Sequence, residues 1–390
     1  MGHRTTTTIS PGNAPPRRDF VGGFWGAAFW AALAIAMTLA AVKSLGPRPP
    51  LEFALAHQDD GGAPFYKEQF LPLPKDTPQV HSSTLTELPG GNILAAWYGG
   101  THELATDTAL YDATFDRAAG QWGPARLLVN REQTAREVHR YIKTLGNPTL
   151  LTDPQGRTWL FYVTTSVGGW SSGAVNVKMT CDGGQSWTAA RRLVLNPMLN
   201  MTTLVRTPAF AYTDGSIALP TYHQGVSKFP ELVHLGPSGE VLGKVRMQQA
   251  RGSLQPSIVA TGPAEAVALM RNMGKGITLM TTTTAGEDWT KPVRLNLTAP
   301  NSSLMAVRLP DGRLMLAFNN STRRMNLSVA ISSDGGRQWE IVHEFPEGTG
   351  AFSYPCLFLA SDGMLHLTYS WNRLGIKHIM FNLAWLRAKP

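Results

Sequence analysis

Cysteine is nearly absent from this chain, which has only Cys181 and Cys356 among its 390 residues. Its ten histidines are scattered, and the sequence has no HExxH motif, no closely spaced cysteine pair and no glycine-rich phosphate-binding loop. We therefore predict no catalytic metal and no cofactor. A structural calcium ion in a propeller loop is the alternative that the sequence leaves open. The formal net charge of +8 is spread along the chain rather than gathered in one run, which argues against nucleic acid as a partner.

The chain does have a segment that recurs six times: a short apolar run, a turn containing Asp-Gly or Gly, and a second apolar run. Only the fourth copy lacks a glycine in register and has Pro263 instead. The turns lie about 50 to 65 residues apart, a period typical of propeller blades or solenoid units. Each copy supplies two strands and leaves room for two more, so the repeats predict an all-β fold of six four-stranded blades. The copies are ELPGGNILAAWY from Glu87, LTDPQGRTWLFYV from Leu151, AYTDGSIALPTY from Ala211, VATGPAEAVALMR from Val259, RLPDGRLMLAF from Arg308 and FLASDGMLHLTYSW from Phe358.

A second motif supports the first. The pattern T-x-D-x-G-x-x-W begins at Thr180, S-x-D-x-G-x-x-W begins at Ser332, and degenerate copies end at Trp122 and Trp289. In such a turn the aspartate accepts backbone N–H groups, the glycine adopts a left-handed conformation, and the tryptophan packs between strands. These motifs resemble the Asp boxes of the sialidase (neuraminidase) superfamily, whose six-bladed β-propeller the chain resembles from about Phe65 onward. The chain resembles the bacterial branch of predicted neuraminidases with BNR-like repeats more than it resembles the well-studied secreted sialidases.

Two details of the chain follow from that resemblance. Cys181 is expected in an Asp-box turn and Cys356 on an innermost strand, so a disulfide between them is not predicted. The C-terminal segment KHIMFNLAW is expected to pair with a strand from Phe65 to Leu71. That pairing would close the ring and remove exposed strand edges.

The N-terminal part suggests an anchor. Residues 20–42 are uncharged and long enough to cross a bilayer as a helix, which needs about 20 residues. We predict a disordered cytoplasmic tail at residues 1–19, a transmembrane signal anchor at 20–42, a linker at 43–63 and the propeller at 64–390. Arg17 and Arg18 favour a cytoplasmic N-terminus, which places the propeller on the periplasmic or extracellular side. A cleaved signal peptide, and hence secretion, is the alternative.

The resemblance also assigns roles to residues where the innermost strands meet the propeller axis. Tyr354 falls at the position of the sialidase nucleophile, a tyrosine that avoids repulsion by the carboxylate on the sugar's anomeric carbon. A buried structural tyrosine is the alternative. Of the arginine triad that binds this carboxylate, Arg271 matches the second member and Arg324 the third, with Arg323 as a register alternative. His81 stands where the first arginine is expected.

The proton-transfer groups depart further from the sialidase pattern. In the loop GGTHELATDTALY, Asp107 is the predicted acid/base and Glu103 its competitor, with a solvated loop carboxylate as the alternative. Gln255 aligns with the glutamate that draws the proton from the tyrosine, and an amide cannot act as a base. Only about one phenol in a thousand is ionised at pH 7 without help. The remaining candidates are His81, His223 or a bound water as a substitute base, and Arg206 as an additional cation for the acidic sugar.

We therefore expect a membrane-anchored exo-glycosidase of the exo-α-sialidase type that removes sialic acid or a related acidic sugar from glycans. Two alternatives stay open because the fold does not fix the substrate. One is a catalytically inactive propeller that binds glycans in cell-surface polysaccharide metabolism, which Gln255 would suit. The other is a lyase acting on uronic-acid polysaccharides through Tyr354 and a histidine, recognisable by an unsaturated product that absorbs ultraviolet light.

Overall fold

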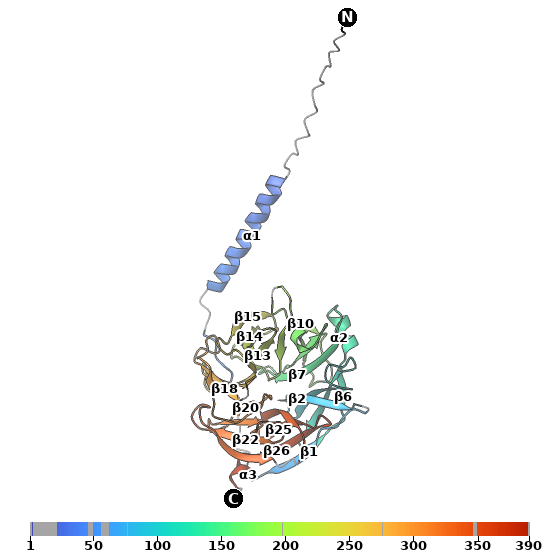
Figure 1. Cartoon of the computed structure of the whole chain (residues 1–390), viewed down its shortest axis with the longest axis vertical. Helices are drawn as coiled ribbons and strands as arrows, with labels where there is room; N and C mark the ends of the chain where they lie inside the picture. The colour runs from blue at the N-terminus through green and yellow to red at the C-terminus, as the bar shows by residue number, and fades with distance from the viewer. Residues whose placement is uncertain are drawn as a thin grey trace. The chain divides into compact units, whose positions relative to one another are not determined.

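The computed structural model describes residues 2, 22–45, 50–55, 62–75, 77–196, 198–274, 276–345 and 349–388. The chain divides into two units, Met1–Pro50 and Leu51–Pro390. The first contains one helix, α1 (Gly22–Leu45) (Figure 1). In the part of the chain that the structure describes, no helix is both long and apolar enough to cross a membrane, so the structure does not support the predicted span at residues 20–42. Apart from Gly2, the predicted tail lies outside the described residues.

The second unit folds into six antiparallel β-sheets, which confirms the predicted six-bladed propeller. Blade 1 contains β2 (Gln79–Glu87), β3 (Ile93–Gly100), β4 (Ala109–Asp116), β5 (Gln121–Trp122) and β6 (Arg126–Val129); blade 2 contains β7 (Thr144–Thr152), β8 (Thr158–Thr165), β9 (Ala174–Thr180) and β10 (Arg191–Arg192). Blade 3 contains β11 (Thr203–Val205), β12 (Phe210–Ala211), β13 (Ile217–Gln224), β14 (Lys228–Leu235) and β15 (Val241–Arg246); blade 4 contains β16 (Ser253–Ala260), β17 (Ala266–Asn272), β18 (Ile277–Thr282) and β19 (Val293–Arg294).

Blade 5 contains β20 (Met305–Arg308), β21 (Leu314–Phe318), β22 (Leu327–Ser332) and β23 (Glu340–Phe345). Blade 6 contains β24 (Phe352–Leu359), β25 (Leu365–Trp371), β26 (Gly375–Phe381) and β1 (Tyr66–Phe70). The short helices α2 (Arg131–Glu137), η1 (Trp170–Ser172) and α3 (Leu383–Arg387) lie outside the sheets. Five of the six predicted turns join the first strand of a blade to the second, and the turn in blade 3 joins β12 to β13. Blades 1 and 3 exceed the four strands predicted because each gains a short fifth one.

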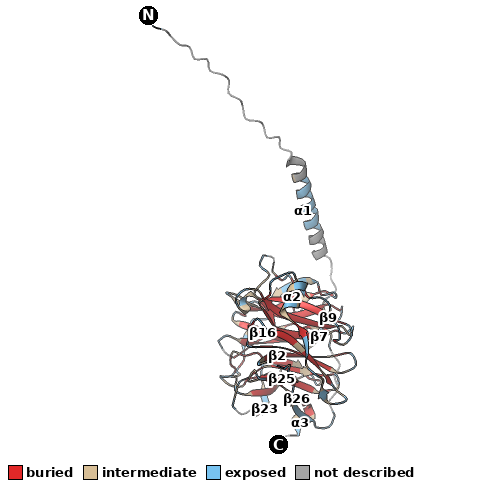
Figure 2. Ribbon diagram, turned by 90° about the vertical axis from the view of Figure 1, so that its right-hand side faces the viewer, coloured by how far each residue is buried: buried red, intermediate tan, exposed pale blue. Residues whose placement is uncertain are grey.

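Burial falls from the first strand of each blade to the last. Strand β2 is almost entirely buried (Figure 2). Strand β15, by contrast, alternates between half-buried and exposed residues. A strand covered on both faces needs apolar or small side chains throughout, and a strand with one wet face alternates. The first strands therefore form the inner ring, and hydroxyl groups join them: the Ser257 hydroxyl, for example, accepts the Ala306 N–H of the next blade at 2.9 Å.

The predicted ring closure and Asp boxes are both present. Strand β1 runs antiparallel to β26, with Tyr66 opposite Phe381. In the second intact Asp box, the Asp334 carboxylate accepts the N–H groups of residues 337 and 338, and the Trp339 indole donates to the Gly336 carbonyl at 2.8 Å. Both cysteines are free, and Cys356 lies on the inner strand β24 as expected.

One segment differs from the predicted domain boundaries. Residues 51–55, which we assigned to the linker, belong to the propeller unit. The Phe53 ring is buried and stacks on Tyr212 at 5.3 Å between ring centres. Its backbone N–H donates to the Pro263 carbonyl. The apolar area buried by this single aromatic ring explains why the segment is ordered here.

A buried histidine pair at the seam between blades 6 and 1 has a defined proton arrangement. The Trp122 indole N–H donates to His378 Nδ1 at 3.0 Å. The proton of His378 therefore lies on Nε2, which is 3.0 Å from His366 Nδ1 and donates to it. Burial lowers the pKa of His366 to about 4, although nearby Asp362 opposes the shift.

This pair predicts a loss of stability in mild acid. Below a pH of about 6.5 the unfolded state takes up a proton that the folded His366 refuses, so the free energy of unfolding falls as the pH drops toward 4. The slope from this group is about 1.4 kcal/mol per pH unit. Urea unfolding at pH 7 and pH 5 measures it, and His366→Gln should show a shallower pH dependence. An unchanged slope in the variant would contradict the assignment.

Candidate active site

Four of the six inner strands share the same interruption near their first residues. In β2, β7, β16 and β24 the pairing with the next strand shifts register, and one non-glycine residue there adopts a left-handed backbone conformation. Such bulges redirect side chains, and each strained residue costs about 1 to 3 kcal/mol, so they cluster at functional sites. The four residues are Ser82 (φ 59°), Asn147 (φ 47°), Gln255 (φ 55°) and Tyr354 (φ 59°).

The sequence carries a signal for these bulges that we did not use. Asn147, Gln255 and Tyr354 are each followed by a proline. Because proline has no N–H to give to a ladder, it marks a break in strand pairing. The recurrence of a polar residue followed by proline on inner strands would have identified Asn147, which the sequence analysis missed.

Tyr354 lies in a cluster of arginines. Arg271 Nη1 donates to the Tyr354 hydroxyl at 3.3 Å, and the Arg324 guanidinium carbon lies 5.5 Å from the centre of the ring. Burial alone would raise the pKa of the phenol, but the charges of Arg271 and Arg324 outweigh it, so the pKa lies below its usual value. Positive charge next to an acidic hydroxyl favours its ionised form.

The structure separates Arg324 from Arg323, which the sequence left as register alternatives for the third triad arginine. Arg271 is near the end of β17 and is largely buried, and its Nε atom has no hydrogen-bond partner among the residues that the structure describes. Arg324 is half-buried in the loop after β21, where its Nη2 atom donates to the Asn301 carbonyl at 2.8 Å. Arg323 is exposed. Arg324, and not Arg323, is therefore the residue that faces Tyr354.

Arg206, the predicted additional cation, directly follows the inner strand β11. Its side chain is 1% exposed and lies under the Tyr354 ring, 5.2 Å from the ring centre. Its Nη2 atom donates to the carbonyls of Tyr354 at 2.9 Å and Pro355 at 3.3 Å, and its Nη1 atom donates to the Ser83 carbonyl at 3.4 Å. These contacts join blades 3, 6 and 1, so Arg206 supports the Tyr354 bulge from below.

His81 also packs against Tyr354, with 4.2 Å between ring centres. Its Nδ1 atom is 2.6 Å from the Ser370 hydroxyl. Burial, followed by the charges of Arg373 and Arg206, holds the pKa of the imidazole well below its usual range. A neutral imidazole supports the tyrosine ring but cannot replace the charge of an arginine.

Gln255 lies beside Tyr354 and is hydrogen-bonded to a second buried phenol, that of Tyr222. Its Nε2 atom donates to the Tyr222 hydroxyl at 3.3 Å, and Asn147 Nδ2 lies 3.5 Å from the same hydroxyl. Burial raises the pKa of Tyr222 to about 12, so this phenol stays neutral. A hydrogen bond from Gln255 contributes to the lowered pKa of Tyr354. The amide thus assists ionisation as a donor, although it cannot accept the proton.

The two loop carboxylates occupy different surroundings. Asp107 is exposed, and its carboxylate accepts the Thr101 N–H at 3.0 Å and the Thr101 hydroxyl at 2.5 Å. The side-chain hydrogen bond from Thr101 lowers the pKa of Asp107. Glu103 instead reaches the Tyr354 surroundings: its charge opposes ionisation of that phenol. Of the two, Glu103 is the carboxylate that the fold brings to the arginine cluster.

Glu103 is held from both sides. Its Oε1 atom accepts the Trp170 indole N–H at 2.8 Å, and its Oε2 atom lies 2.7 Å from Arg373 Nη1. Arg373 lies in the turn between β25 and β26 and has a left-handed backbone (φ 59°). Its charge is felt by His81 and by Arg324. The sequence analysis missed Arg373 because nothing in the turn WNRLG distinguishes it from an ordinary surface turn.

His223 does not join this group by any contact that the described residues show. Its ring stacks on Phe229 at 4.6 Å, and its Nδ1 atom is 2.8 Å from the Ser227 carbonyl, at the end of the β13 hairpin. The structure thus gathers Tyr354, the arginines, His81, Gln255 and Glu103, and leaves Asp107, Arg323 and His223 outside.

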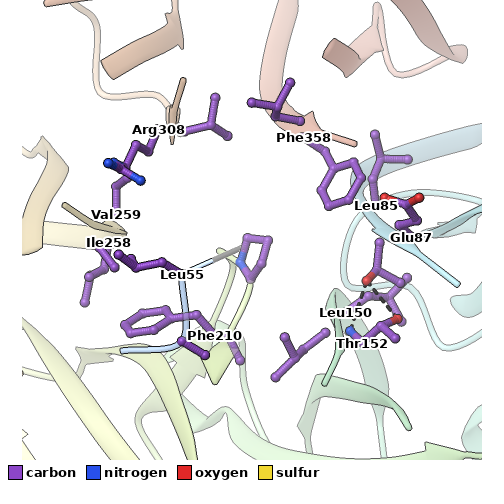
Figure 3. Close-up of a pocket in the computed structure, with 18 of the residues that line it drawn as sticks. Leu55, Leu85, Glu87, Leu150, Thr152, Phe210, Ile258, Val259, Arg308 and Phe358 are labelled. Carbon is purple, nitrogen blue, oxygen red and sulfur yellow. Dashed lines mark hydrogen bonds between the residues drawn. The ribbon is translucent and has the colours of Figure 1, made fainter. Parts of the chain in front are cut away.

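A cavity of about 390 Å³ lies at the opposite ends of the inner strands (Figure 3). Its wall is mainly apolar, and its residues follow the bulges along each strand. They include Leu85 and Glu87 on β2, Leu150 and Thr152 on β7, Ile258 and Val259 on β16, and Phe358 on β24. The cavity therefore belongs to the far end of the propeller axis and takes no part in the site around Tyr354.

Comparison with known proteins agrees with this architecture. The family model of the BNR repeat-like domain matches residues 91–367. A sialidase of Micromonospora viridifaciens is 24% identical over 411 aligned residues, covering 90% of this chain and 59% of that protein. A sialidase of Bacteroides fragilis is 22% identical, covering 62% of this chain and 50% of that protein. The chain thus spans between half and three fifths of these relatives.

Among solved structures, the intramolecular trans-sialidase of Ruminococcus gnavus, determined with oseltamivir carboxylate, superposes with a TM-score of 0.68. It is 14% identical, and the match covers 83% of this chain and 99% of that one. At this identity the likeness shows the shared fold. The family match over residues 91–367 shows that this chain belongs to the BNR repeat-like domain family.

Proposed function

We propose that the protein is an exo-glycosidase that hydrolyses a terminal acidic sugar, sialic acid or a close relative, from glycans. The observation that carries this proposal is the Tyr354 phenol held against Arg271 in a cluster of arginines. A guanidinium fork matches a carboxylate with two parallel hydrogen bonds. An acidic sugar bound by Arg271 and Arg324 would have its anomeric carbon beside a phenol that is easier to ionise than usual.

The chemistry then follows from the residues at hand. The Tyr354 phenol first releases its proton to a water molecule, and its phenolate oxygen attacks the anomeric carbon as the bond to the leaving oxygen breaks. Water later adds to the same carbon, breaks its bond to the tyrosine oxygen and releases the sugar. The leaving oxygen needs a proton from a nearby acid. Glu103 suits this role better than the predicted Asp107, because Asp107 is bound within its own exposed loop.

The direct test is turnover by the full chain of methylumbelliferyl glycosides of N-acetylneuraminic acid and glucuronic acid, with the neutral galactoside as control. We expect release from an acidic substrate only. Release from the neutral glycoside alone would contradict the proposal.

Fractionating the expressing cells into membrane and soluble parts tests the proposed anchor at residues 20–42 and the placement of the propeller outside the cytoplasm.

One observation favours a second candidate, a propeller that binds acidic glycans without cleaving them. Gln255 stands next to Tyr354, and no carboxylate is shown in hydrogen-bonding contact with that phenol among the described residues. Binding of N-acetylneuraminic acid without turnover of any glycoside in the panel would support this candidate over the hydrolase.

A further inference from the structure

We propose that Arg373 is a third arginine for the carboxylate of the substrate, and that Glu103 occupies it until an acidic sugar takes its place. This inference rests on the proposed function, because it concerns the same site. It makes the pair of Glu103 and Arg373 a determinant of specificity: a sugar without a carboxylate has nothing to exchange for Glu103.

The balance of donors and acceptors is the first support. Arg206 is committed to backbone carbonyls below the ring. Arg271 keeps a buried Nε atom without a partner. Arg324 directs one nitrogen to the Asn301 carbonyl, and burial lowers its pKa. The cluster therefore has more cationic donors than acceptors, as a site for an anion with two oxygens requires.

The second support is the position of Glu103, the carboxylate that the described contacts place within this cluster. It bridges two blades, since Trp170 comes from blade 2 and Arg373 follows β25 of blade 6. The exchange conserves charge, because one carboxylate replaces another on Arg373. Glu103 keeps the Trp170 indole as a partner, so its displacement does not leave it without a hydrogen bond.

The third support is that the loop carrying Glu103 has its own internal brace. Thr101 donates twice to the Asp107 carboxylate, which ties the two ends of the loop together independently of Glu103. The Glu103 side chain can therefore move while the loop keeps its shape.

Calorimetric binding of free N-acetylneuraminic acid and of its methyl ester tests the exchange. All variants are made in the full chain carrying Tyr354→Phe, so that turnover does not interfere. Removing Arg373 with Arg373→Met should weaken binding of the acid about 10- to 100-fold, with partial recovery in Arg373→Lys. Glu103→Gln should tighten it several-fold, since no internal anion then competes. The ester should respond to neither change.

The matched control is Arg294→Met, which removes an exposed cation of β19 and should leave binding unchanged. Unaltered binding of the acid in Arg373→Met, or weaker binding in Glu103→Gln, would overturn the exchange while leaving the proposed function in place. Failure of the parent Tyr354→Phe chain to bind any acidic sugar would count against the proposed function itself. Thermal melts of each variant establish that it is folded.

Discussion

Replacing Tyr354 with phenylalanine is expected to reduce turnover of acidic-sugar glycosides at least about a thousandfold, because it removes the nucleophilic oxygen. The fold should survive the change, since the hydroxyl loses only its contacts with Arg271 and Gln255 and the ring stays in place over Arg206. Substrate affinity should change little, because the arginines remain. The measurement is kcat and KM for the full chain on the best substrate of the glycoside panel.

Tyr222→Phe is the matched control for this prediction. Its hydroxyl is also buried, and it accepts a hydrogen bond from Gln255, but the raised pKa keeps it a neutral phenol. We expect a loss of less than about tenfold, in line with one neutral hydrogen bond. Tyr354→Phe retaining more than a tenth of the wild-type kcat would show that the phenol oxygen does not form the bond to the sugar.

The second large effect concerns stability. Arg206→Met keeps much of the side-chain volume but removes the donors to the carbonyls of Tyr354, Pro355 and Ser83. Leaving buried carbonyls without partners costs about 1 to 3 kcal/mol each. We expect the free energy of unfolding to fall by about 3 kcal/mol, and the melting temperature by about 5 °C.

Differential scanning calorimetry checks this result, with Arg294→Met as the exposed control. A melting temperature for Arg206→Met within about 1 °C of the control would mean that the carbonyls find other partners. Turnover should fall as well, because the left-handed conformation of Tyr354 depends on this support.

The fold was predictable because repetition encodes it. Each apolar strand pair and its turn appears six times, so errors in a single copy, such as Pro263 in place of a glycine, do not disturb the pattern. The Asp boxes and the closing strand depend on local spacing in the same way. Phe53 was missed because one aromatic residue in a short segment outside the repeats carries no periodic signal.

The site was predicted most directly where it lies on repeated elements. Tyr354, Gln255 and Arg271 occupy strands, whose register follows from the blade pattern. Glu103 and Arg373 lie in turns between strands, where the backbone path is set by tertiary contacts and not by alternation. The choice between Glu103 and Asp107 therefore required the Trp170 and Arg373 contacts. The burial of Arg206 likewise depends on three blades meeting, which no single segment reveals.

The pairing of β1 with β26 has a consequence for how the protein is made. Tyr66 meets Phe381 only after nearly the whole propeller has been synthesised. At about 5 to 20 residues per second, the ribosome needs roughly 15 to 60 s to make the chain between these partners. During that interval β1 and the growing end of the sheet ring wait as unpaired edges, which are prone to aggregate. Closing the last blade is thus a late step of folding. A truncation that removes either β1 or β26 would prevent it.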